Sequence, residues 1–180
     1  MRYLYVILVI LTISGCSSKS SSYLLPSDNL KVVATIKTQI GVKKIEVPNY
    51  LNSDKILIQE GSKVTEANSN FVAPPSELLT QKSIAILKSS LNNPNVWLYP
   101  WDIKEKKGYI VEIVLDKFIY KDAEAVVSGS YYIKDANGNL LVSKNFIKQE
   151  PSKKDSKSIV NNLSTLFTKV VIEIAQKIAR

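Results

Sequence analysis

One cysteine directly follows a short apolar run, and its surroundings predict a specific covalent modification. The run covers residues 3–13, follows Arg2, and leads into Ser14-Gly15-Cys16. A basic start, an apolar segment and small residues at a cleavage point are typical of a secretory signal peptide. A thiol at that point is a nucleophile that can form a thioether with a diacylglyceryl group, after which the chain is cut and the new amine is acylated. The pattern predicts a bacterial lipobox in which Cys16 is lipidated.

A membrane-spanning helix is the alternative for the same segment. Such a helix needs about 20 apolar residues, and the run of residues 3–13 is shorter. Three acyl chains would hold a domain firmly, because one chain is marginal and two usually suffice. We therefore expect an anchored protein. Ser17 follows the cysteine, where aspartate would favour retention in the inner membrane of a Gram-negative cell, so we expect the periplasmic face of the outer membrane.

Other residues that could do chemistry are few. The sequence has no histidine and only one cysteine, which removes the commonest general base and metal ligand. A zinc site, a Ser-His-Asp triad and a Cys-His pair are thereby excluded. Glu112 and Asp116 lie four residues apart on a predicted strand, but no nucleophile or oxyanion donor accompanies them, and Ser128 and Ser130 lack a base. We expect no enzyme activity, no metal, and no cofactor besides the lipid on Cys16.

The charge of the chain is strongly positive and is carried almost entirely by lysine. The formal net charge is +8, and the only arginines are Arg2 and Arg180. Nucleic-acid binding proteins usually rely on arginine for bidentate contacts, so we expect no nucleic-acid partner. Two interpretations stay open: a solvated lysine surface, or attraction to anionic lipid headgroups or an acidic partner.

The chain divides into three parts. We expect a signal peptide at 1–15, a lipidated N-terminus with a flexible serine-rich tether at 16–22, and a single globular periplasmic domain at 23–180. Removing residues 1–15 from 180 leaves 165, which is enough for one domain with a proper core.

Periodicity within the domain predicts strands and two helices. The helices are expected at 76–91, with Ser76 as N-cap, and at 159–178, after a polar connector at 151–158. A strand at 109–120 is mostly apolar on one face and mixes apolar residues with Glu112 and Asp116 on the other, so both faces should be partly covered and the strand central. The other strands are expected at 30–47 (one or two), 55–60, 64–67, 96–100, 125–134 and 140–148. This predicts an α+β or mixed α/β fold, with a mixed sheet of at least five strands, an antiparallel meander and two helices packed on the sheet.

The order of these pieces resembles a known family. Besides Cys16 and the terminal apolar helix, the features that carry the likeness are Tyr23-Leu24-Leu25-Pro26, Val47-Pro48-Asn49-Tyr50-Leu51, Lys55-Ile56-Leu57-Ile58, Tyr109-Ile110-Val111-Glu112-Ile113 running into Phe118, Gly129-Ser130-Tyr131-Tyr132 and Gly138-Asn139-Leu140. The chain resembles the PqiC-type ABC-transport auxiliary lipoproteins. One departure is Phe71-Val72-Ala73, which stands where that family often has a tryptophan-centred segment.

The resemblance implies a function without catalysis. It implies an outer-membrane accessory subunit whose partner is the periplasmic part of an MCE-domain ABC transporter, which moves phospholipid between membranes. The alternative is an assembly lipoprotein that associates with an outer-membrane β-barrel, of the lipopolysaccharide-insertion type. A third class, a glycan hydrolase with two carboxylates, has no supporting constellation. The protein that co-purifies would distinguish the first two.

Two aromatic segments are candidate partner-binding sites. Tyr50 and Leu51 either form a docking loop or close the edge of the core, and both interpretations stay open. Trp97, Tyr99 and Trp101 alternate along one predicted strand. They could form a binding surface, but we favour a core position for the first two, with Trp101 at the rim beside the lysines of 104–107. The candidate binding residues are Tyr50, Leu51 and Trp101.

Overall fold

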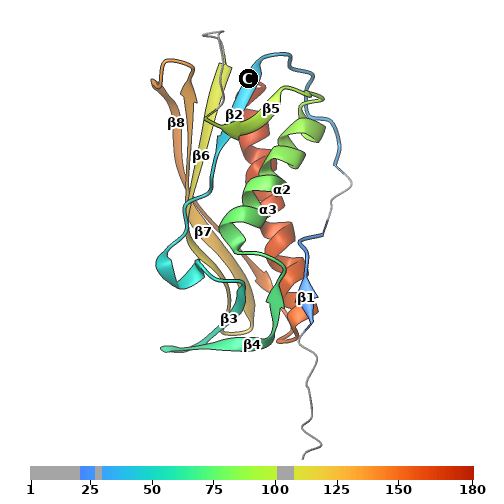
Figure 1. The fold of residues 1–180 in the computed structure, drawn as a ribbon, viewed down its shortest axis with the longest axis vertical. Coiled ribbons are helices and arrows are strands. Elements are labelled where there is room, and N and C mark those ends of the chain that lie inside the picture. Colours follow the sequence, from blue (N-terminus) through green and yellow to red (C-terminus); the bar gives the residue numbers. More distant parts are fainter. Residues whose placement is uncertain (1–20, 27–29, 101–107) are drawn as a thin grey trace, which may run out of the picture.

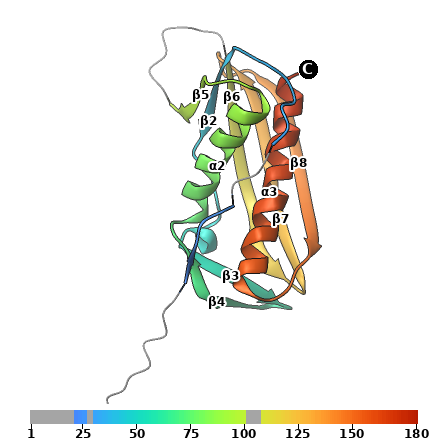
Figure 2. The same ribbon diagram turned by 90° about the vertical axis from the view of Figure 1, so that its right-hand side faces the viewer.

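A mixed β-sheet of eight strands forms the frame of the molecule, and two helices pack against it (Figures 1 and 2). The computed structural model describes residues 21–26, 30–100 and 108–180. The elements are β1 (Ser22–Tyr23), β2 (Gln39–Lys43), η2 (Asn49–Leu51), β3 (Lys55–Glu60), β4 (Lys63–Phe71), α2 (Pro75–Ser90), β5 (Val96–Tyr99), β6 (Gly108–Lys121), β7 (Glu124–Asp135), β8 (Leu140–Pro151) and α3 (Ser156–Ile178). The predicted fold class is confirmed.

Strand β6 is the centre of the sheet, as its apolar faces predict. Along one edge it pairs antiparallel with β7, and β7 pairs antiparallel with β8. Along the other edge it pairs in parallel with β2 near its start and with β3 near its end. The strand order β1-β4-β3-β6-β2-β5 leaves β1, β5 and β8 at the edges of the sheet.

A β-bulge in β6 changes which side chains face the core. Leu115 pairs with Gly129, whereas Lys117 pairs with Ser128, so Asp116 stands outside the ladder. Directly paired residues share a face of the sheet, so Phe118, opposite Val127, continues the side that Leu115 occupies. A Cβ atom at Gly129 would lie 2.1 Å from the carbonyl oxygen of Val114, and glycine therefore allows the strands to approach at the bulge.

Helix α3 supplies the largest share of the core from one element. Its predicted apolar stripe is buried against the sheet and α2. The helix begins three residues earlier than predicted, because the carboxylate of Asp155 accepts a hydrogen bond of 2.9 Å from the backbone N–H of Ser158 and caps it. The buried stripe consists of Ile159, Leu163, Leu166, Phe167, Val170, Val171, Ile174 and Ile178.

One detail of the prediction is wrong, the N-cap of the first helix. Of the one or two strands predicted within 30–47, the structure has one, β2, with a further bridge at Glu46. Residues 30–38 instead run beside the end of α2, where the N–H groups of Val33 and Ile36 donate to the carbonyl oxygens of Ser90 and Leu91. Helix α2 has Pro74 as its N-cap, and Ser76 lies buried inside the first turn.

Candidate functional site

The predicted docking loop is a rigid turn with one side chain inside and one outside. Leu51 is only 2% exposed and belongs to the core, whereas Tyr50 is 46% exposed. The hydroxyl of Tyr50 donates a hydrogen bond to the backbone carbonyl of Asp116, at the bulge of β6. Burial, followed by the negative charge of Asp116, raises the pKa of the Tyr50 hydroxyl. Of this pair, only Tyr50 presents its side chain to a partner in this conformation.

The other predicted site residues, Cys16 and Trp101, and the lysines of 104–107 lie outside the described residues. The strand just before Trp101 is described, and it carries exposed apolar side chains. Trp97 is 51% exposed and Leu98 is 48% exposed. The interpretation of Trp97 as a core residue is therefore wrong. The reason is that β5 lies at the edge of the sheet, where β2 is its pairing partner among the described strands, so Trp97 and Leu98 are exposed although Val96 on the same strand is buried.

Lysine side chains border these exposed residues. The ammonium of Lys88, near the end of α2, lies 4.4 Å from the ring centroid of Trp97, and that of Lys43 lies 5.9 Å from the ring of Tyr99. Both distances suit cation–π attraction. We call Trp97, Leu98, Tyr99 and the two lysines the β5 patch. Pro100 was the available sequence signal for this edge, because proline lacks an N–H and is confined to the edges of sheets.

A second exposed apolar edge lies on β8. Leu140, Leu141 and Ile147 are all more than half exposed on this strand, which pairs only with β7. The aromatic residue of this strand, Phe146, is buried against Tyr131 and adds nothing to the exposed surface, and β7 separates β8 from β6.

The two carboxylates considered for catalysis, Glu112 and Asp116, have different surroundings. Glu112 Oε1 lies 2.6 Å from the ammonium of Lys43 and 2.8 Å from that of Lys134. Burial alone would raise the pKa of Glu112, but hydrogen bonds from Lys134 and Lys43 outweigh it and lower the pKa. Asp116 is exposed at the bulge. The arrangement ties β2, β6 and β7 together and brings no reactive pair into one place.

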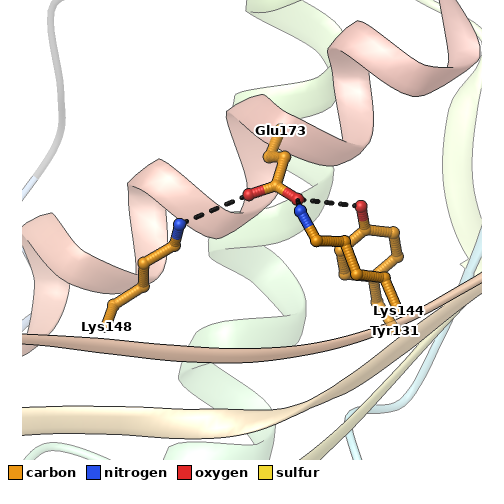
Figure 3. Close-up of polar contacts among 4 residues, drawn as sticks. All are labelled: Tyr131, Lys144, Lys148 and Glu173. Atoms are coloured by element: carbon orange, nitrogen blue, oxygen red, sulfur yellow. Dashed lines mark hydrogen bonds and ion pairs between the residues drawn. The ribbon is translucent and has the colours of Figure 1, made fainter.

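A similar cluster joins α3 to the meander (Figure 3). The carboxylate of Glu173 accepts hydrogen bonds from the Tyr131 hydroxyl at 3.1 Å, from Lys144 at 2.5 Å and from Lys148 at 3.4 Å. Burial opposes ionisation of Glu173, but these hydrogen bonds prevail and lower its pKa. Among the described residues, no group of histidine, cysteine, aspartate and glutamate side chains could hold a metal ion. Both polar clusters join separate elements of the fold through hydrogen bonds to a carboxylate.

A family model matches residues 23–175 of this chain, and its description is "ABC-type transport auxiliary lipoprotein component". The chain belongs to this family. The auxiliary lipoprotein is thus a membrane-anchored component of an ABC-type transport system. Within the described residues no helix is both long and apolar enough to cross a bilayer. No curated protein matches the sequence.

Solved structures share the fold of this auxiliary lipoprotein at low sequence identity. The crystal structure of an uncharacterized protein has a TM-score of 0.72 and 21% identity, covering 88% of this chain and 98% of that one. Protein XCC0632 from Xanthomonas campestris has a TM-score of 0.70 and 14% identity, covering 89% and 92%. A variant of PelC from Paraburkholderia phytofirmans, crystallised as a dodecamer, has a TM-score of 0.52 and 16% identity, covering 84% and 96%.

Proposed function

We propose that this auxiliary lipoprotein is a non-enzymatic subunit of an MCE-type ABC transporter that moves phospholipid between two membranes. The lipid on Cys16 anchors it to the periplasmic face of the outer membrane. The β5 patch docks the periplasmic part of the transporter. The observation that carries the docking role is that the β5 patch lies at the end of the domain opposite β1, the first described strand after Cys16 (Figure 1).

The tether places one end of the domain near the membrane. Ser22, where β1 begins, lies six positions after Cys16, and six residue steps reach about 20–22 Å when fully extended. Strand β1 lies beside β4 at one end of the molecule, while β5 lies at the other end, in both views (Figures 1 and 2). The β5 patch can therefore point away from the anchoring membrane, toward a partner that approaches across the periplasm.

The chemistry of the patch suits a protein partner. Interface cores are rich in aromatic side chains and poor in charge, while their rims are polar. Trp97 and Leu98 supply apolar surface, and Lys43 and Lys88 supply positive charge at its border. An edge strand also offers unpaired backbone groups to which a partner can add a strand. We expect the partner surface to be apolar with acidic residues around it.

Site-specific crosslinking in the cell tests this proposal. A photoreactive amino acid is placed at Trp97, Leu98, Tyr50 or Trp101, and Ile147 on β8 is the control because it is exposed and apolar but outside the patch. We expect capture of an MCE-domain protein from Trp97 or Leu98, and none from Ile147. Capture of an outer-membrane β-barrel from the same positions would favour the insertion-factor alternative. Equal capture from Ile147, or none from the patch of a folded and anchored protein, would contradict the docking role.

A further inference from the structure

An apolar groove lies between helix α2 and the segment that leads from β1. Its volume is about 400 Å³, within the range of about 300–1,000 Å³ for small-molecule sites. Leucine and proline side chains dominate its walls, and those used below are Leu24, Leu25, Pro26 and Leu30 from the segment, and Leu78 and Ile86 from α2. Leu24 is 69% exposed, so part of this apolar wall is open to solvent.

Hydrogen bonds hold the walls of the groove in place without a ligand. The carbonyl oxygen of Tyr23 accepts from the N–H of Val72 at 3.0 Å, and that of Pro26 accepts from the ammonium of Lys82 at 2.6 Å. Farther along, the N–H of Val33 donates to the carbonyl oxygen of Ser90 at 2.6 Å. The described parts of this wall, residues 23–26 and 30–33, are thus hydrogen-bonded to β4 or α2 in the absence of a ligand.

The groove is long and has its charge at one place. Its wall on α2 extends from Leu78 to Ser89, and eleven helical residues span about 16 Å. Lys82 is the one charged residue among the described lining residues, and its ammonium donates a hydrogen bond to the carbonyl oxygen of Pro26. A long channel with mostly apolar walls suits an acyl chain.

The membrane is within reach of the groove. Leu24 lies eight positions after Cys16, so Cys16 lies at most about 26–29 Å along the extended chain from the start of the groove. Leu24 directly follows β1, and β1 lies at the end of the molecule opposite β5 (Figure 1). The anchoring geometry therefore brings the groove close to a bilayer, which is a concentrated source of acyl chains.

We propose that this groove binds one acyl chain of a phospholipid drawn from the anchoring membrane. The inference deepens the proposed function and rests on it, because a lipid transporter needs a place where a phospholipid leaves or enters the bilayer. The β5 patch and the groove then divide two tasks, docking at one end of the domain and lipid contact beside α2.

Photolabelling with a defined lipid tests the groove. The purified, lipidated protein is placed in phosphatidylethanolamine and phosphatidylglycerol vesicles that contain a trace of phosphatidylethanolamine with a diazirine in its acyl chain. After illumination, trypsin releases residues 83–88 of α2, which include Ala85 and Ile86. We expect the label on this peptide. Ala85→Trp fills the groove from an exposed position and should lower labelling at least about fivefold, whereas Thr165→Trp on the exposed face of α3 should leave it unchanged.

Three results would overturn the inference. Equal labelling of exposed apolar peptides elsewhere, such as that of Ile147, would indicate nonspecific contact with the bilayer. Unchanged labelling of a folded Ala85→Trp variant would mean that the chain binds elsewhere. The third result comes from a second experiment, in which the protein carries a photoreactive acyl chain on Cys16 and is placed in vesicles without photoreactive lipid. If residues 83–88 are labelled in this experiment but not by the photoreactive phosphatidylethanolamine, the groove is occupied by the protein's own anchor. Because no transporter is present, each result is independent of docking.

Discussion

The hydroxyl of Tyr131 on β7 donates a hydrogen bond of 3.1 Å to Oε1 of Glu173 on α3 (Figure 3). The ring of Tyr131 is fully buried, so its hydroxyl reaches Glu173 from inside the core. Burial, the hydrogen bond to Glu173 and the charge of that carboxylate raise the pKa of Tyr131 to about 12. Because Lys144 and Lys148 bind the same carboxylate from β8, one side chain connects the terminal helix to two strands.

Loss of the Glu173 charge should destabilise the domain. Glu173→Gln keeps the shape of the side chain but removes its charge and so weakens three hydrogen bonds. A hydrogen bond to a charged group contributes about 1.5–3 kcal/mol to stability. We expect the free energy of unfolding to fall by about 1–3 kcal/mol, measured by urea denaturation. Glu60→Gln is the control, because its pair with Lys154 is exposed on both sides and should matter far less. Equal effects of both changes would show that the cluster adds nothing beyond a surface ion pair.

The same carboxylates make stability depend on pH in the acid range. The pKa values of Glu112 and Glu173 in the folded protein are lowered from 4.5. A lowered folded pKa means that the stabilisation is fully present above the unfolded value and disappears as the pH falls through the folded value. We therefore expect stability to decline below about pH 4.5. Denaturation curves of Glu173→Gln should show a shallower decline, and an identical slope would contradict the assignment.

Packing of the terminal helix should dominate stability. Leu166 lies on α3 and its side chain is buried in the core. Leu166→Ala should therefore lower the free energy of unfolding by about 2–5 kcal/mol. Thr165→Ala, on the exposed face of the same helix, should change it by less than about 0.5 kcal/mol. A loss below about 0.5 kcal/mol for Leu166→Ala would be incompatible with a buried helix face.

Lipidation should depend on one residue. Cys16→Ser removes the only thiol in the sequence, so the variant should be unlipidated and largely uncleaved. Metabolic labelling with a palmitate analogue should mark the wild-type protein alone, and gel mobility should report the retained signal peptide. Palmitate labelling of the Cys16→Ser variant, or the absence of labelling in the wild-type protein, would refute Cys16 as the lipid acceptor.

Sequence patterns predicted the parts of the fold that depend on local periodicity. The stripe from Ile159 to Ile178 predicted α3, because a helix that buries one face must repeat its apolar residues at helical spacing. The apolar faces of 109–120 predicted a central strand, and Asn137-Gly138 predicted the turn of the meander, where Gly138 has a φ of 87°. The lipobox predicted a lipoprotein, which the family match supports.

Only the tertiary structure decided which apolar residues are covered. Trp97 and Leu51 are both apolar neighbours of proline-containing turns, yet Trp97 is half exposed at an edge strand and Leu51 lies in the core. The bulge at Asp116 and the groove beside α2 likewise depend on strands and segments far apart in the chain. Periodicity records that a side chain is apolar, but burial depends on which element packs over it, and that is a property of long-range contacts.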